Sequence, residues 1–305
     1  MCPSYFQLYD SGELRKRVIS LYKILLSCTL CPRKCGVNRI IGEQGFCKSG
    51  FLPKVASNNV HKGEEPPISG TNGSGTIFFS SCTLSCDFCQ NFPISQLGTG
   101  KEVTVTDLAD MMIRLQKKGC HNINFVTPTH FVPQIVHALL IATRKGFSLP
   151  VVYNASGYES LEVLKLLDGI VDIYLPDMKY DDDKNALKYS HVSGYKEINR
   201  IAIKEMHRQV GVLQTDENNI AVRGLIIRHL VLPDGLSGSK KILDYIKENL
   251  GNDTYISLMS QYFPAHRAVA DQALSKKIGY EEYSEIVEYL EKLGFSSGWT
   301  QNLLH

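Results

Sequence analysis

Residues 82–89 read CTLSCDFC, and they directly follow the apolar run TIFF at residues 76–79. Cysteines spaced three and then two residues apart bring their sulfurs to one point only on a loop, because a helix scatters them and a strand alternates them between faces. Three thiolates hold three irons of a 4Fe–4S cluster and leave the fourth iron open for a substrate or cofactor. A three-ligand zinc site and three ordinary core thiols are the alternatives. A loop of this spacing after a strand favours the iron–sulfur cluster, with Cys82, Cys86 and Cys89 as its ligands.

At these residues the chain resembles the radical S-adenosylmethionine superfamily, whose signature C-x3-C-x-aromatic-C is matched with Phe88 as the aromatic residue. The flanking runs GSGTIFF at 73–79 and CQN at 89–91 resemble the pyruvate formate-lyase activating enzyme-like group. The similarity extends from about Cys28 to Trp299. It implies an oxidoreductase that reductively cleaves S-adenosylmethionine at the open iron to a 5′-deoxyadenosyl radical, which abstracts hydrogen.

Several further expectations come with this resemblance. One form of the reaction installs a glycyl radical on a partner enzyme, and the electron comes from a donor such as flavodoxin or ferredoxin. Phe88 is implied to lie at the cofactor, and no side chain is assigned a catalytic role of its own. A non-catalytic iron–sulfur electron-transfer protein or a zinc-binding protein is the alternative class.

The composition sets outer limits on the function. The chain has 305 residues, 43% of them hydrophobic, and a formal net charge of +2, which gives no electrostatic reason to expect nucleic acid or an anionic membrane as a partner. Its start carries no signal-peptide core, and no apolar run approaches the roughly 18 residues of a membrane span. With nine cysteines and no export signal, a cytoplasmic protein with metal-ligating thiols is predicted.

Four more cysteines precede the first predicted strand of the main domain. An amphipathic helix over residues 12–27 leads into a C-x2-C-x3-C-x11-C run, in which glycines allow the backbone to wrap around a metal. Four thiolates form a closed site for either zinc or a second 4Fe–4S cluster, with unligated thiols as the remaining alternative. The predicted role is structural or electron relay, and the ligands are Cys28, Cys31, Cys35 and Cys47.

From residue 75 onward, short β-rich runs alternate with helical ones. This alternation predicts an α/β fold, a partial (β/α)6 barrel of the TIM type over residues 75–305, and the family resemblance implies the same architecture. Residues 1–74 are predicted to form an N-terminal module of helix, four-cysteine site and linker, with 50–74 as the linker. The strands are predicted at 75–80, 122–127, 150–154, 171–175, 224–231 and 254–259, and the helices at 105–118, 131–145, 158–168, 196–210, 239–249 and 281–292.

Polar residues after the predicted strands should line the ligand site, because that site lies at the carboxyl ends of the strands in such folds. Many relatives carry Gly-Gly-Glu after the second strand, so Thr127, Thr129 or a backbone carbonyl must substitute here. His130 either contacts the ligand or begins a helix ahead of Pro133.

Later strand ends supply four more candidates. Asn154 can hydrogen-bond the cofactor, with a helix-capping turn as the alternative. Asp177 and Lys179 alternate on one face of an extended segment, and activating enzymes have a matching Asp-x-Lys, which implies that both bind the cofactor. A surface ion pair is the alternative for these two. The resemblance also carries over His266 as a contact to the cofactor ribose, whereas His229 is interpreted as a paired core histidine.

Overall fold

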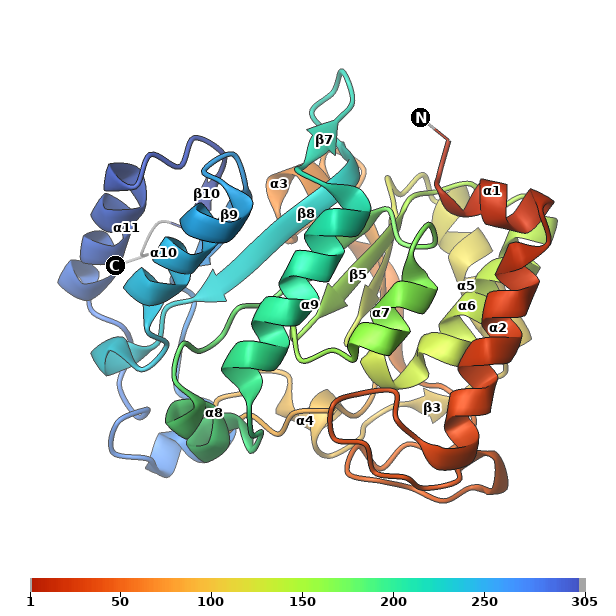
Figure 1. Ribbon diagram of the computed structural model, residues 1–305, viewed down its shortest axis with the longest axis horizontal. Helices are drawn as coiled ribbons and strands as arrows, with labels where there is room; N and C mark the ends of the chain where they lie inside the picture. Colours follow the sequence, from red (N-terminus) through yellow and green to blue (C-terminus); the bar gives the residue numbers. More distant parts are fainter. Residues whose placement is uncertain (1, 302–305) are drawn as a thin grey trace.

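The computed structural model describes residues 2–301, whose strands form one extended sheet (Figure 1). Along the sheet the order is β10-β9-β8-β6-β5-β4-β2-β1-β3, and β7 pairs with β8 at the side. All pairings from β2 to β10 along this path are parallel, whereas β1 is antiparallel to both β2 and β3. The strands are β1 (Lys54–His61), β2 (Ser74–Phe79), β3 (Lys101–Glu102), β4 (Ile123–Val126), β5 (Val151–Ala155), β6 (Ile173–Pro176), β7 (Gln214–Thr215), β8 (Ala221–Leu230), β9 (Tyr255–Met259) and β10 (Gly298–Thr300).

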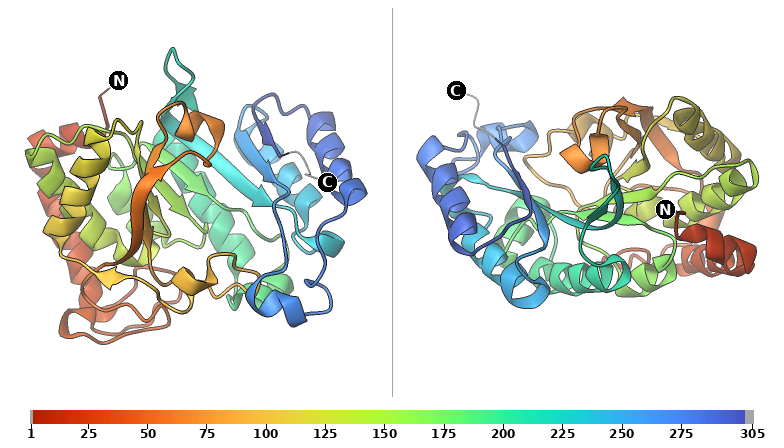
Figure 2. Two further views of the ribbon diagram at one scale, coloured as in Figure 1. Left: turned by 180° about the vertical axis from the view of Figure 1, so that it is seen from behind. Right: turned by 90° about the horizontal axis from the view of Figure 1, so that it is seen from above.

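Helices lie along the outer side of the curved sheet, as the view from above in Figure 2 shows. Because β5 is covered on both faces, all five of its residues are buried, and four of them are Val, Tyr or Ala. The α-helices are α1 (Tyr5–Asp10), α2 (Glu13–Ile24), α3 (Pro66–Ser69), α4 (Phe92–Ser95), α5 (Val105–Lys117), α6 (Val132–Arg144), α7 (Leu161–Leu167), α8 (Asp183–Ser190), α9 (Tyr195–Val210), α10 (Ser239–Leu250) and α11 (Tyr280–Lys292).

Local sequence signals explain where individual helices begin. Thr104 and Asp107 form a reciprocal capping box at the start of α5, with the Thr104 hydroxyl accepting from the Asp107 amide at 3.1 Å. Pro133 occupies the first turn of α6, where its missing N–H leaves no helical hydrogen bond unmade. The six predicted strands and six predicted helices of the barrel are each present within a few residues of the expected bounds.

The interpretation of residues 50–74 as a linker is wrong. This segment contains β1 and the short helix α3, and β1 pairs with β2 over Val55–His61. The proline and glycine content that suggested a linker is concentrated after β1, where the chain turns through α3 into β2. β1 extends the sheet beyond the parallel strands, and the turn after it reaches the inner side of the barrel.

The N-terminal helices pack on the barrel. Buried side chains on one face of α2, including Leu14 and Leu21, join the same hydrophobic core as those of α6. The Tyr5 hydroxyl of α1 donates to the Leu149 carbonyl at 3.1 Å, just ahead of β5. Among the described helices, none combines the length and the apolar character needed to cross a membrane.

Candidate functional site

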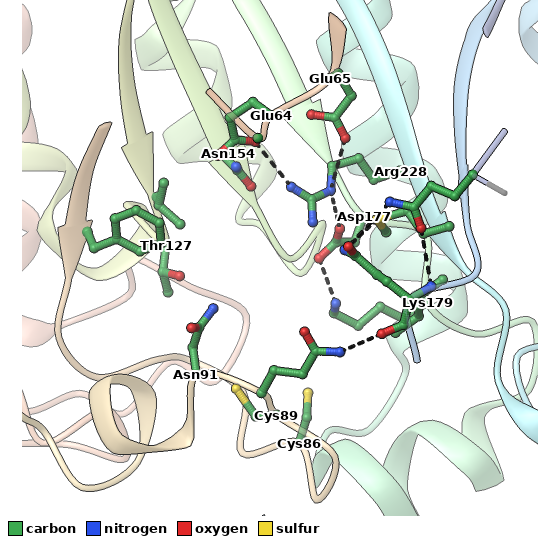
Figure 3. Close-up of a pocket in the computed structure, with 18 of the residues that line it drawn as sticks. Glu64, Glu65, Cys86, Cys89, Asn91, Thr127, Asn154, Asp177, Lys179 and Arg228 are labelled. Atoms are coloured by element: carbon green, nitrogen blue, oxygen red, sulfur yellow. Dashed lines mark hydrogen bonds and ion pairs between the residues drawn. The ribbon is translucent and has the colours of Figure 1, made fainter. Parts of the chain in front are cut away.

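A pocket of about 350 Å³ opens inside the barrel, at the carboxyl ends of the parallel strands. Cysteines of the 82–89 loop lie at one end, the carboxylates of Glu64 and Glu65 lie at the other, and Asp177 lies between them (Figure 3). Its volume is in the range of pockets that hold one cofactor-sized ligand. We call it the central pocket, and its walls include His61, Glu64, Glu65, Phe78, Cys86, Phe88, Cys89, Asn91, Thr127, Asn154, Asp177, Lys179, Arg228, Leu230, Met259, Gln261, Trp299 and Gln301.

Cys86 and Cys89 line the base of this pocket, and Cys82 lies near both of them outside its wall. Each sulfur has one hydrogen-bonding group nearby: the Leu84 amide donates to Cys82 Sγ at 3.4 Å, the Ser190 hydroxyl donates to Cys86 Sγ at 2.9 Å, and the Ser95 hydroxyl lies 3.1 Å from Cys89 Sγ. Such hydrogen bonds are a means by which proteins tune iron–sulfur clusters.

The electrostatics of this loop call for a metal. Burial is the main cause that raises the pKa of Cys82, and the neighbouring Cys86 adds to it. Burial likewise raises the pKa of Cys86 to about 11, although Lys179 opposes the rise. The thiols of Cys82 and Cys86, whose pKa values are raised, become thiolates when a cation such as a metal centre neutralises them. The loop therefore fits a metal centre bound through thiolates.

Asp177 and Lys179 follow β6 and enter the central pocket together, as the alternation predicts. Lys179 Nζ donates to Asp177 Oδ2 at 2.6 Å, and both side chains are largely buried. Burial disfavours the charge on Lys179, but Asp177 and Cys86 outweigh it and raise the pKa of the lysine. This pair is not the surface ion pair of the alternative interpretation, because it lies inside the barrel beside the cysteines.

Three charged residues of the central pocket were not predicted from the sequence. Arg228 of β8 lies 3.4 Å from Asp177 Oδ1, 3.6 Å from Glu65 Oε1 and 3.7 Å from Glu64 Oε2. Burial is the main cause that raises the pKa of Glu64, the positive charge of Arg228 opposes it, and the adjacent Glu65 adds to it. Two features of the sequence could have indicated these residues. Glu64 and Glu65 stand directly before two prolines, and Arg228 stands inside an apolar run.

These ion pairs involve buried charged atoms. Arg228 Nε, Asp177 Oδ1 and Glu65 Oε2 are buried, and none has a hydrogen-bond partner among the residues described. Arg228 Nε and Asp177 Oδ1 lie 3.4 Å apart as an ion pair, so the charges of this wall, rather than free hydrogen-bonding atoms, are what a polar ligand would meet. A zwitterion with a ribose diol, such as S-adenosylmethionine, offers the complementary donors and acceptors. The pocket therefore fits this cofactor.

Thr127 and Asn154 also lie in the wall of the central pocket, at the ends of β4 and β5. Thr127 has φ +59°, and its amide donates to the Asn154 carbonyl at 2.9 Å. This left-handed conformation is strained for a β-branched residue, and such strain concentrates at ligand sites. Thr129, in contrast, is buried outside this wall and donates to Glu159 Oε1 at 2.8 Å.

Two histidines lie where an interpretation of the sequence placed them. His229 is a paired core residue, with Nδ1 2.6 Å from the Met178 carbonyl and Nε2 2.8 Å from Ser239 Oγ. His130 is buried in the turn ahead of α6, and its Nε2 lies 2.8 Å from the Ser80 carbonyl.

His266 is not part of the central pocket wall. Its ring stacks on Phe92 with 4.7 Å between centroids, and its Nε2 lies 3.1 Å from Gln96 Oε1. The chain after β9 turns toward α4, so Gln261 rather than His266 lines the central pocket. The structure therefore brings Phe88, Thr127, Asn154, Asp177 and Lys179 together but leaves His266 outside.

The four N-terminal cysteines surround a second, smaller cavity. Cys28 and Cys31 are buried, whereas Cys35 reaches the surface. Leu30, Arg33, Val37, Arg39, Gly45, Phe46, Thr83 and His130 complete its wall. We call this the four-cysteine cavity. Neither here nor elsewhere in residues 2–301 do three or more His, Cys, Asp or Glu side chains converge as ligands of a single metal ion.

The chain belongs to the radical SAM superfamily. The model of that superfamily matches residues 76–212, which run from β2 through the Cys82–Cys89 loop to the end of α9. Enzymes of this superfamily use a 4Fe–4S cluster and S-adenosylmethionine for radical chemistry, so the chain is assigned to an enzyme superfamily. An uncharacterized protein of Methanocaldococcus jannaschii, MJ0674, is 32% identical over 281 residues, which cover 88% of this chain and 75% of the relative.

Solved structures show the same fold at low sequence identity. The FeFe-hydrogenase maturase HydG superposes with a TM-score of 0.51 at 12% identity, over 74% of this chain and 50% of HydG. SuiB of Streptococcus suis, bound to its precursor peptide SuiA, superposes with a TM-score of 0.50 at 12% identity, over 73% of this chain and 47% of SuiB. The chain spans about half the length of these solved proteins.

Proposed function

We propose that this protein is a radical enzyme whose Cys82–Cys89 loop holds a 4Fe–4S cluster and whose central pocket binds S-adenosylmethionine at the open iron. The cysteines at the base of the pocket, facing charged side chains, are the observation that carries the proposal. The bound cluster and cofactor supply an electron and a 5′-deoxyadenosyl radical for hydrogen abstraction.

The chain's own residues position the cofactor in this proposal. Asp177 and Lys179 meet its polar groups beside the cysteines, where low solvent exposure strengthens each contact. Thr127 and Asn154 hold it from the opposite wall and replace the missing Gly-Gly-Glu run. Phe88 is buried between Tyr180 and Tyr262 and excludes water from the base of the pocket.

Product analysis tests this function. Anaerobically reconstituted protein should form 5′-deoxyadenosine from S-adenosylmethionine and dithionite. The variant with Cys82, Cys86 and Cys89 all changed to alanine should form none. Cys120→Ala removes a buried thiol outside both cysteine sites and should behave as wild type. Cluster-loaded wild type that forms no deoxyadenosine would falsify the proposal.

The finer form of the proposal is the transfer of the radical to a glycine of a partner enzyme, with flavodoxin or ferredoxin as electron donor. The resemblance of residues 73–79 and 89–91 to activating enzymes supports it. A candidate partner incubated with the loaded enzyme should show the doublet of a glycyl radical by electron paramagnetic resonance. Deoxyadenosine formation without any such signal would reject this form and leave cofactor cleavage intact.

The alternative class, a non-catalytic electron carrier, has no use for the central pocket. An electron carrier needs a cluster near the surface, whereas Cys86 and Cys89 of this chain line a cavity whose wall also carries five charged side chains. Those side chains are Glu64, Glu65, Asp177, Lys179 and Arg228.

A further inference from the structure

We infer that the four-cysteine cavity holds a second 4Fe–4S cluster, which lies against the Cys82–Cys89 loop and passes electrons to it. The presence of the second cluster stands on its own observations. Its relay role rests on the function proposed above. The wrapping of the chain, the charges of the cavity wall and the contact between the two cysteine sites support the second cluster.

Residues 28–47 wrap tightly enough to bring four cysteines to one cavity. The Cys28 amide donates to the Val37 carbonyl at 2.9 Å, and the Phe46 amide lies 3.5 Å from Cys35 Sγ as its donor. A Cβ on Gly45 would lie 2.8 Å from Cys35 Sγ, so only glycine allows this approach. The wrap therefore gathers thiols that are up to 19 positions apart in sequence.

The charges of the wall favour an anion in this cavity, beside the buried Arg39 and the half-buried Arg33. Arg39 is 1% exposed and donates to two backbone carbonyls, of His130 and Gly50. No carboxylate of residues 2–301 forms an ion pair with Arg39 or with Arg33. A buried cation without a counter-charge is strongly destabilising. Four thiolates around a metal core carry the negative charge that these two arginines lack.

The arrangement suits a cluster better than a single zinc ion. Zinc draws four thiolates to about 2.3 Å from one point and serves as a structural ion, whereas these cysteines line a cavity that Thr83 of the Cys82–Cys89 loop also lines. A cubane of four irons and four sulfides has a larger core, so its thiolates stand farther apart around it. Four thiolates also leave none of its irons open, so the site binds no substrate.

The two cysteine sites share a wall. Thr83, the residue after Cys82, lines the four-cysteine cavity and is buried there. Arg33, between two of the N-terminal cysteines, donates from Nε to the Thr83 carbonyl at 2.6 Å. One hydrogen bond therefore joins the Cys31–Cys35 segment directly to the residue after Cys82, so the two cysteine sites lie side by side.

The relay moves one electron and changes no covalent bond. A low-potential donor, dithionite in the assay, gives one electron to the oxidised second cluster. That cluster returns to its oxidised form when the same electron passes to the cluster of the Cys82–Cys89 loop. Cys35 reaches the surface, which allows a donor to approach this side of the second site.

Iron and sulfide counts in two complementary variants test the second cluster. Protein is prepared anaerobically and reconstituted, and iron, sulfide and zinc are measured. Wild type and the control Cys120→Ala should each hold about eight irons, because each cubane contains four. The Cys82/Cys86/Cys89 triple alanine variant should keep about four irons with matching sulfide, and Cys31→Ala/Cys35→Ala should also keep about four.

The Cys82/Cys86/Cys89 triple variant identifies the metal of the four-cysteine cavity even if Cys31→Ala/Cys35→Ala fails to fold. About one zinc without sulfide, or no metal at all, in the triple variant would overturn the second cluster. Loss of deoxyadenosine formation in wild type with eight irons would instead count against the proposed function alone. For the relay, paramagnetic resonance of fully reduced wild type should show two interacting spins. A spectrum equal to the sum of the two single-cluster variants would reject the electron transfer between them.

Discussion

Replacing Asp177 with asparagine removes one charge from the middle of the central pocket and keeps the size of the side chain. Asp177 accepts a hydrogen bond from Lys179 at 2.6 Å, lies 3.4 Å from Arg228, and has an Oδ1 that no described residue satisfies. The side chains of Asp177 and Lys179 are 16% and 18% exposed, so water screens their contacts only partly. Asp177 also lies in the wall of the central pocket, so a bound cofactor would meet its negative charge.

The expected loss follows from one charge-assisted contact. A hydrogen bond to a charged group contributes about 1.5–3 kcal/mol, which corresponds to a roughly 10- to 150-fold rise in the Kd for S-adenosylmethionine. Calorimetric titration of anaerobically reconstituted protein measures this Kd. Iron content and the cluster spectrum should not change, because the Asp177 side chain is not one of the proposed cluster ligands.

Asp181→Asn is the matched control. Asp181 is 5% exposed and pairs with Arg200 at 2.6 Å, but it lies outside the wall of the central pocket. Its loss should lower the free energy of unfolding without changing the Kd. Wild-type affinity in Asp177→Asn, or equal weakening in both variants, would show that Asp177 acts only as a structural ion pair.

Three further predictions concern other parts of the chain. The free energy of unfolding should fall as the pH drops from about 6.5 toward 4, because burial lowers the pKa of His229 to about 4 and only the unfolded chain then takes up the proton. In denaturant titrations across this pH range, the free energy of unfolding of His229→Gln should fall by up to about 3 kcal/mol less than that of wild type. An equal fall in both proteins would contradict this role of His229. Gly157→Ala should weaken cofactor binding together with stability, since Gly157 has φ +74° and a Cβ there would collide with the Asp177 carbonyl; an unchanged Kd would show that the pocket tolerates this shift. Thr104→Ala should cost about 1 kcal/mol of stability through the α5 capping box, and a changed iron content would refute this purely local role.

The alternation of strands and helices could be read from the sequence because it depends on local spacing. Apolar runs such as 150–154 and amphipathic periods such as 196–210 reflect burial on two faces or on one. β1 was not predicted from the sequence, because its exposed and half-buried positions carry polar residues that give no clear strand period. Asn58 and Asn59 are among them. Pairing with β2, rather than its own composition, makes that segment a strand.

The Cys82–Cys89 loop and the Asp177–Lys179 pair were also visible in sequence, because each depends on residues a few positions apart. Only the tertiary structure decided which distant residues join them. The turn after β1 brings Glu64 and Glu65 against Arg228 of β8, more than 160 positions away. In the same way Arg33 reaches Thr83, and the chain after β9 carries His266 to Phe92 instead of the central pocket. Spacing along a chain fixes the face on which a side chain lies, whereas the neighbour it meets there depends on how the whole sheet curves and pairs.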